Sequence, residues 1–230
     1  MRRFYKATGI SKNEKGYAIT LDERAVRTPA GATLTVVSRA LAEAIAGEWE
    51  AQGEEIEPQT MPLTRLAATT LDHVGASRDK IIAEALQYAT MDLLCYRAEA
   101  PALLAQRQAE AWQPLLDWAA KRHRAPLVVT AEIAAIDQPA SSLAALEAAL
   151  CALDDPSLAA LQDCAGICHS LILGLALVEG EISAEAAWEI SQLDENFQIE
   201  RWGSDTEAEK RREILRADLM AVERFLSLGR

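Results

Sequence analysis

The spacing of apolar residues changes at Ser38, and that change limits the folds open to this chain. Before Ser38 the pattern alternates: Gly16–Leu21 (GYAITL) places Tyr17, Ile19 and Leu21 on one face, which is typical of a strand. Two more short stretches, 24–29 and 32–37, follow with turn residues between them, so we expect an antiparallel meander. Ser38 is a good helix N-cap, and after it the apolar residues recur at helical spacing.

Nearly all of the chain beyond Gly53 has helical spacing. The sequence therefore predicts an α+β fold, with a small antiparallel β-rich N-terminal domain followed by a larger, mostly α-helical domain. We place the first domain, which includes one helix, at residues 1–58 and the second at residues 59–230. The acidic segment Glu54–Pro62, which carries two prolines, is the predicted linker.

Three features of the helical part give specific expectations. The stretch 126–130 (PLVVT) is a late strand candidate, which we consider for pairing with the N-terminal sheet. Asp155 and Pro156 resemble an N-cap and first helical residue, so we expect one core helix from there to about Gly180. A further helix is expected from the cap Ser183 to Trp202.

Charge and hydropathy exclude two classes of partner. The net charge of −12 is unfavourable for binding nucleic acid, which needs a basic face, and for docking on anionic lipid. The longest apolar run, Ala165–Val178, has about 14 residues, whereas a membrane span needs about 20. We therefore interpret that run as a buried core helix and expect no nucleic-acid partner and no membrane insertion.

The cysteines and the N-terminal residues indicate a cytoplasmic protein. The chain has four cysteines, Cys95, Cys151, Cys164 and Cys168, without the spacing of a disulfide framework. Arg2 and Arg3 precede aromatic residues rather than an apolar run, so we do not predict a leader peptide. The expected location is the cytoplasm of a bacterium.

Candidate sites for metal, nucleotide or nucleophilic chemistry are weak. Cys164, Cys168 and His169 supply half of a zinc site, and the sequence has no second cysteine–histidine pair to complete it. Adjacent residues of a helix point about 100° apart, so His169 and Ser170 cannot act together as base and nucleophile. No phosphate loop or dinucleotide fingerprint occurs in the sequence. We expect no metal, no cofactor and no catalytic residue.

The acidic stretch LDENFQIERWGSDTEA, residues 193–208, leaves two interpretations open. Asp194, Gln198 and Arg201 share one helical stripe, which could be a solvated face or could hold an acid–base pair with Glu195. Asp194 lies at the edge of a core-facing stripe, so we expect it to be exposed. Gly203 then suits a helix end, and Ser204 with Glu207 forms a capping-box pattern for the last helix.

Trp49 and Gln52 lie at the end of the first predicted helix, next to the linker. Trp49 shares a stripe with Leu41 and Ile45, so we expect it to contact the β-rich domain and to fix the pairing of the two domains. The alternative is a partly exposed tryptophan that contacts a partner, because tryptophan is enriched in interface hot spots.

Eight blocks of the sequence, in order, resemble one known family. The chain is similar over nearly its full length to the assembly chaperones that escort the α subunit of the F-type ATP synthase catalytic head (the ATP-twelve family). The blocks are RFYK (3–6), LDERAVRTPAG (21–31), LAEAIAGEWEAQ (41–52), TMPLTRLAATTLD (60–72), TMDLLCYR (90–97), WQPLLDWA (112–119), SLILGLALVEG (170–180) and the acidic stretch at 193–208.

The resemblance implies a chaperone that binds the unassembled α subunit, hydrolyses no ATP and is a monomer when free. Eukaryotic relatives would work in the mitochondrial matrix. Asp194 matches a position that is glutamate in other members, so its charge is kept with a shorter reach, and Thr206 stands where relatives often have an acid. The residues expected to bind the partner are Asp194, Glu195, Gln198 and Trp202.

Two other classes of function remain as alternatives to a chaperone. A small cytosolic hydrolase or lyase would use the acids near Asp194, and would lose turnover when both Asp194 and Glu195 are replaced. A constitutive structural subunit would stay in the finished complex. A chaperone is instead expected to capture free α subunit and to be absent from the assembled enzyme.

Overall fold

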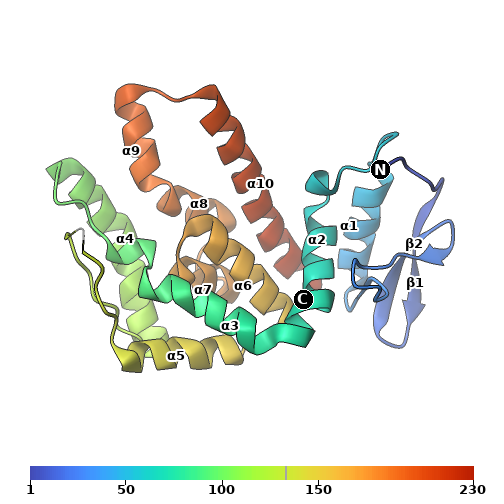
Figure 1. Ribbon diagram of the computed structural model, residues 1–230, viewed down its shortest axis with the longest axis horizontal. Helices are drawn as coiled ribbons and strands as arrows, with labels where there is room; N and C mark the ends of the chain where they lie inside the picture. The colour runs from blue at the N-terminus through green and yellow to red at the C-terminus, as the bar shows by residue number, and fades with distance from the viewer. Residues whose placement is uncertain (133) are drawn as a thin grey trace. The chain divides into compact units, whose positions relative to one another are not determined.

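The computed structural model describes residues 1–132 and 134–230, and it contains a small antiparallel sheet followed by helices (Figure 1). This confirms the predicted α+β class. The chain forms two compact units: unit 1 is Met1–Arg78, Asp155–Ala160 and Ala221–Arg230, and unit 2 is Asp79–Asp154 and Leu161–Met220. Unit 1 therefore collects three separate pieces of the chain. The domain boundary predicted from the sequence, between residues 58 and 59, is a statement about independently folding domains. It stays a prediction.

The sheet of unit 1 centres on β2, which pairs with each of the other strands. The pairing is antiparallel throughout, but the two-residue strands β3 and β4 both pair with β2, so the sheet departs from a plain meander. Gly16 has a φ of +136°, and a Cβ there would collide with the carbonyl oxygen of Val36 in β4. The strands are β1 (Thr8–Asn13), β2 (Gly16–Leu21), β3 (Arg24–Ala25) and β4 (Thr35–Val36).

The first helix covers the sheet with the stripe that its sequence predicts. In α1 (Arg39–Glu50), Leu41 and Ile45 are buried, and the helix packs against β1 and β2. The predicted cap is confirmed, because the Ser38 hydroxyl accepts a hydrogen bond from the backbone N–H of Leu41. The core of unit 1 therefore lies between this helix and the strands.

A side chain of α1 also caps the next helix. The carboxylate of Glu48 accepts hydrogen bonds of 2.8 Å from the backbone N–H groups of Leu63 and Thr64, at the start of α2 (Pro62–Thr69). Burial raises the pKa of Glu48, and these hydrogen bonds act in the opposite direction. The predicted linker before α2 contains the short 3-10 helix η1 (Pro58–Thr60). The π-helical turn η2 (Thr70–Val74) follows α2.

Unit 2 packs around α7 (Leu171–Glu179), which is apolar up to its last residue. Every residue from Leu171 to Val178 of α7 is buried, and a Cβ at Gly174 would lie 3.2 Å from the carbonyl oxygen of Leu161. Close approach of α7 to the preceding helix thus depends on that glycine. The remaining elements, some of which run into unit 1, are α3 (Gly75–Thr90), η3 (Leu93–Cys95), α4 (Ala102–His123), α5 (Ala140–Cys151), α6 (Asp155–Cys168), α7 (Leu171–Glu179), α8 (Ala184–Ser191), α9 (Leu193–Trp202) and α10 (Thr206–Gly229).

Two predicted helices are each divided in the structure. The core helix breaks between α6 and α7, where His169 has a φ of +52° and Ser170 caps α7 through a 3.0 Å hydrogen bond from Leu173. The helix expected from Ser183 to Trp202 breaks at Gln192, which ends α8 outside the helical conformation. Both predictions of one continuous helix were wrong, because the tertiary contacts of these residues outweigh the helical spacing.

The late strand candidate pairs elsewhere than expected. Thr130 forms a parallel bridge with Tyr96, supported by hydrogen bonds from Arg97 N–H to Thr130 and from Thr130 N–H to Cys95. Both segments belong to unit 2, so the considered pairing with the N-terminal sheet was wrong. Within residues 1–132 and 134–230, no helix is long and apolar enough to cross a membrane.

Candidate partner-binding site

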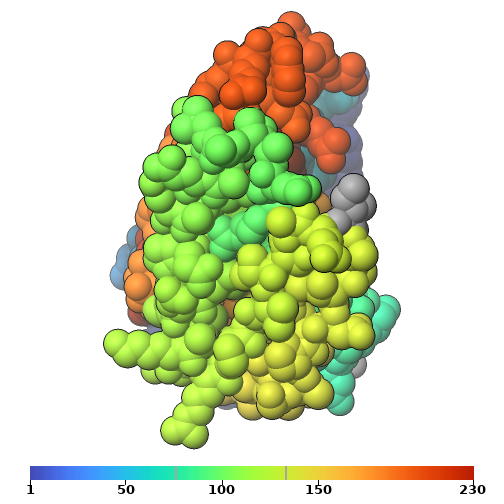
Figure 2. All heavy atoms as spheres, turned by 90° about the vertical axis from the view of Figure 1, so that its left-hand side faces the viewer, coloured from blue at the N-terminus to red at the C-terminus, as the bar shows by residue number. Residues whose placement is uncertain are grey.

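The acidic stretch forms α9, and one buried ring anchors it. Phe197 is buried, with the guanidinium groups of Arg201 and Arg107 at 4.2 Å and 5.5 Å from its ring centroid. Arg107 of α4 also forms a 2.8 Å ion pair with Glu200. Arg201 therefore stacks on the ring instead of holding an acid of its own helix. Figure 2 shows the face of unit 2 that carries α4, with the residues around the end of α9 at the top.

Asp194 belongs to a polar network that reaches into α4. Its carboxylate accepts a 2.7 Å hydrogen bond from the side-chain amide of Gln108, which is 1% exposed. The amide oxygen of Gln108 in turn accepts a 2.7 Å hydrogen bond from the backbone N–H of Ala98. Asp194 is itself half-buried, so the expectation that it stands exposed was wrong. Its position at the edge of the core stripe brings it against α4 and not into open solvent.

Arg97 is the third side chain of this network. Its Nη1 donates a hydrogen bond to the carbonyl oxygen of Gln108, and its guanidinium lies 5.1 Å from the ring centroid of Trp112. Burial lowers the pKa of Arg97, whereas the charges of Cys95 and Asp194 act in the opposite direction. Its Nε and Nη2 atoms are buried without a hydrogen-bond partner among the described residues. The negative charge of Asp194 therefore faces an incompletely paired cation.

Glu195, the next residue, points to α10 instead. It is exposed and lies 3.2 Å from Nη1 of Arg212, whose guanidinium stacks over the ring of Trp188 at 5.5 Å. Arg212 also donates a hydrogen bond to the side chain of Asn196. Arg212 thus joins α8, α9 and α10 at one point.

A hollow of about 240 Å³ opens at the corner between α9 and α10. Three of the predicted partner-binding residues line it, and Trp202 is 76% exposed. Gly203, with a φ of +80°, makes the turn after α9. The lining residues are Glu195, Gln198, Ile199, Trp202, Gly203, Ser204, Asp205, Ala208, Glu209 and Arg212. Asp194 contacts α4 instead, so the four predicted residues divide between this corner hollow and the Asp194 network.

The start of α10 differs from the predicted capping box. Ser204 bonds the carboxylate of Glu209, and the backbone N–H of Glu207 donates to the side chain of Asp205 at 3.5 Å. The prediction that Ser204 and Glu207 cap each other was wrong, because Asp205 takes the capping position. The result is an acidic rim, formed by Glu195, Asp205 and Glu209, beside the exposed indole of Trp202.

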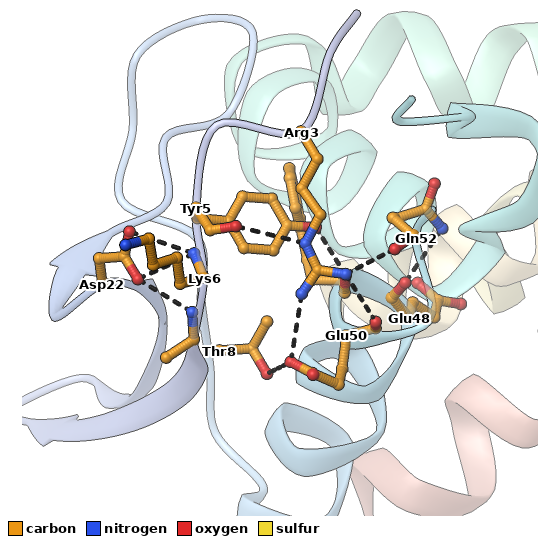
Figure 3. A network of polar contacts seen from close by, with 10 residues as sticks. Arg3, Tyr5, Lys6, Thr8, Asp22, Glu48, Glu50 and Gln52 are labelled. Atoms are coloured by element: carbon orange, nitrogen blue, oxygen red, sulfur yellow. Dashed lines mark hydrogen bonds and ion pairs between the residues drawn. The ribbon is translucent and has the colours of Figure 1, made fainter. Parts of the chain in front are cut away.

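Gln52 lies in a polar network of unit 1 around the end of α1 (Figure 3), and Trp49 belongs to the last turn of the same helix. The backbone carbonyl of Trp49 accepts a 2.6 Å hydrogen bond from the hydroxyl of Tyr5, and the rings of these two residues meet edge to face at 5.8 Å. Gln52 is buried and accepts a 2.7 Å hydrogen bond from the backbone N–H of Glu57. Its amide donates to Thr60, so it ties η1 to α1. The proposed role of Trp49 and Gln52 in pairing two domains stays a prediction.

The cysteine pair does not converge with its neighbouring histidine. Cys164 and Cys168 are buried with their sulfur atoms 4.0 Å apart, whereas His169 is exposed. In the described part of the chain, no group of three or more His, Cys, Asp or Glu side chains is arranged to hold a metal ion.

Sequence reasoning missed the partners that α9 finds on other helices. Gln108 lies 86 residues from Asp194, and Arg107 lies 93 residues from Glu200. The spacing within one helix carries no signal for such pairs. The only local hint was Arg97, which ends one of the blocks that resemble the chaperone family.

The model of the family described as "ATP12 chaperone protein" matches residues 2–120, which is more than half of the chain. The chain belongs to the ATP12 chaperone family. Its members are ATP synthase assembly factors, and the family is one of chaperones and not of enzymes. The alternative of a small enzyme with acids near Asp194 is therefore set aside.

Individual proteins to which the chain is similar agree with this assignment. The crystal structure of Atp12 from Paracoccus denitrificans is 45% identical, covers 100% of this chain and 98% of that chain, and has a TM-score of 0.91. The Atu1473 protein from Agrobacterium tumefaciens is 38% identical over 98% of this chain and 85% of that chain, with a TM-score of 0.92. The mitochondrial protein atp12 of Schizosaccharomyces pombe is 25% identical over 88% of this chain and 74% of its own length.

Proposed function

We propose that this ATP12 family member binds the unassembled α subunit of the F-type ATP synthase catalytic head. It prevents aggregation of that subunit until the hexamer assembles, and it hydrolyses no ATP. The observation that carries the proposal is Trp202, a large ring that is 76% exposed beside the acidic rim of the corner hollow. Exposed tryptophans with polar surroundings are typical of interface hot spots.

The chemistry of the site suggests how the client is recognised. Glu195, Asp205 and Glu209 favour a basic client surface, while Trp202 supplies apolar contact area. Asp194 contributes through its network with Gln108 and Arg97, either by direct contact or by holding the face of α4 and α9 in place. Asp194, Glu195, Gln198 and Trp202 thus remain the proposed partner-binding residues.

Mass action explains how such a protein can both hold and release a client. An unassembled subunit exposes apolar surface that drives aggregation, and a chaperone that covers it lowers the free concentration of sticky subunit. A binding free energy of about −8 kcal/mol corresponds to micromolar affinity. The larger interfaces of the finished hexamer can outcompete that affinity, so release needs no ATP.

We infer that the protein works as a monomer in the bacterial cytoplasm. Cys95, Cys164 and Cys168 are buried free thiols, which suits a reducing compartment.

Capture of the α subunit tests the proposal. Purified protein is mixed with the isolated α subunit as that subunit is diluted from denaturant, and both light scattering and the recovered complex are measured. We expect suppressed aggregation and a complex that disappears when the β subunit is added. Trp202→Ala should weaken capture about tenfold, as loss of a hot spot does. Glu147→Lys, an exposed charge change on α5, is the control and should capture normally. Failure of the unmodified protein to bind would overturn the proposal.

A further inference from the structure

Unit 1 carries a second hollow, of about 660 Å³, between the N-terminal segment, the β2–β3 turn and the end of α1. Three aromatic rings form a continuous wall on one side of it. Phe4 and Tyr5 meet edge to face at 5.5 Å, and Tyr5 and Trp49 do so at 5.8 Å. The residues that line it are Met1, Phe4, Tyr5, Leu21, Asp22, Arg24, Ala25, Val26, Arg27 and Trp49.

The wall has one exposed ring that a partner can cover. Phe4 is 65% exposed, although it is one of the larger apolar side chains. The indole Nε1 of Trp49, by contrast, is buried and has no hydrogen-bond partner among the described residues. Because the fold encloses this atom, the exposed ring of Phe4 is the feature that a partner covers.

The charges at the hollow oppose the charge of the whole chain. Arg24 and Arg27 are exposed at its lining, in a protein whose net charge is −12. The one acid of the lining, Asp22, already accepts hydrogen bonds from the backbone N–H groups of Lys6 and Ala7, which lower its pKa (Figure 3). Asp22 stays exposed and its charge also acts on Arg24, but two arginines against one acid leave a local excess of positive charge.

We propose that this hollow is a second client-binding surface, which takes an extended segment of the client with a large apolar side chain next to a carboxylate. The apolar side chain contacts the wall formed by Phe4, Tyr5 and Trp49. The carboxylate pairs with Arg24 and Arg27. This rests on the proposed function for the identity of the client, but its chemistry is opposite to that of the acidic corner hollow on unit 2. The two surfaces thus select different parts of one client.

Charge reversal with a matched control tests the proposal. Arg24→Glu combined with Arg27→Glu should weaken capture of the isolated α subunit at least about tenfold, because the segment's carboxylate is then repelled. Lys12→Glu combined with Lys15→Glu changes the net charge equally at exposed positions of the same unit and should capture normally.

A photo-crosslinking residue in place of Phe4 gives a second, independent readout. We expect a crosslink to a client peptide that contains an acid beside an aromatic or large aliphatic residue. A crosslink to a basic peptide, normal capture by the arginine double variant, or equal loss in the lysine control would each overturn this inference. If the unmodified protein captures no α subunit at all, the proposed function fails instead, so the two failures are distinguishable.

Discussion

At the scale of single residues, Asp194 is a half-buried charge that takes part in a network of unit 2. Asp194 holds the amide of Gln108 and offsets the charge of Arg97, so a substitution there changes the fold as well as the surface. If Asp194 were exposed, as its position in the sequence suggests, Asp194→Lys would leave the melting temperature nearly intact and abolish capture, with a weaker effect for Glu195→Lys. The structure changes the first half of that expectation, because lysine would place a second cation near a buried guanidinium.

A pair of variants separates the structural role of Asp194 from its proposed role in binding the client. Asp194→Asn keeps an oxygen that can accept from Gln108, so its free energy of unfolding should stay within about 1 kcal/mol of the unmodified protein. Asp194→Lys should lose about 1–3 kcal/mol. If the charge is what the client recognises, both variants lose capture. Capture of the α subunit and urea unfolding are measured for both variants. Normal capture by Asp194→Asn would show that the client does not recognise the charge of Asp194.

Asp92 gives a pH prediction that is independent of the client. Its fully buried carboxylate accepts hydrogen bonds from the backbone N–H groups of Leu94 and Ile172, at the start of α7. Burial raises its pKa from 3.8 to about 6. The folded state therefore binds this proton more tightly than the unfolded state, and the associated stability is present below pH 3.8 and lost as the pH rises through about 6.

Between pH 4.5 and 7.5 this loss should amount to about 2 kcal/mol. Asp92→Asn removes the titration, although its amide N–H₂ group also faces backbone donors and lowers stability at every pH. The measurement is the difference in unfolding free energy between the two proteins across that pH range. A constant difference would show that Asp92 has an ordinary pKa in the fold.

At the scale of elements, the end of α1 joins several segments of unit 1. Glu48 caps α2, Gln52 holds η1, and Trp49 meets the N-terminal segment through Tyr5. Glu48 and Trp49 belong to α1 and Gln52 follows its end, so one short stretch of chain holds three neighbouring segments.

Trp49 tests how much this junction depends on its ring. Trp49→Ala should lower the free energy of unfolding by about 3 kcal/mol, because a large half-buried side chain is lost. Trp49→Phe should lower it by no more than about 1 kcal/mol, since it keeps the edge contact with Tyr5. Thermal unfolding followed by circular dichroism gives both values. An unchanged melting temperature for Trp49→Ala would mean that the indole serves only a partner.

The whole molecule combines a strongly negative net charge with two hollows of opposite local charge. If the proposed client surface is basic, a net charge of −12 would steer it toward the protein at long range, and salt would screen this attraction. We expect the association rate with the α subunit to fall about tenfold between about 0.05 M and 0.5 M salt, with little change in the dissociation rate. Stopped-flow mixing measures both rates. An association rate that is independent of salt would exclude steering by net charge.

The sequence alone determined the features that depend on near neighbours in the chain. The strand Gly16–Leu21, the cap of α1 at Ser38 and the positive φ of Gly203 all follow from residues within about four positions. The family was also readable, because its blocks are contiguous stretches. These signals are local, and local physics is the same in the isolated segment and in the fold.

Only the tertiary structure decided which distant groups meet. The break at His169 and Ser170 follows from contacts with the segment around Asp92, and helical spacing gives no sign of it. The environment of Asp194 depends on Gln108, a partner 86 residues away in sequence. Without the contact to Gln108, the carboxylate of Asp194 would be a solvated charge. With that contact, the carboxylate is part of a hydrogen-bonded network. The burial of a side chain and its hydrogen-bond partners are properties of the packed unit. The environment of Asp194 therefore depends on the tertiary structure and not on its own helix.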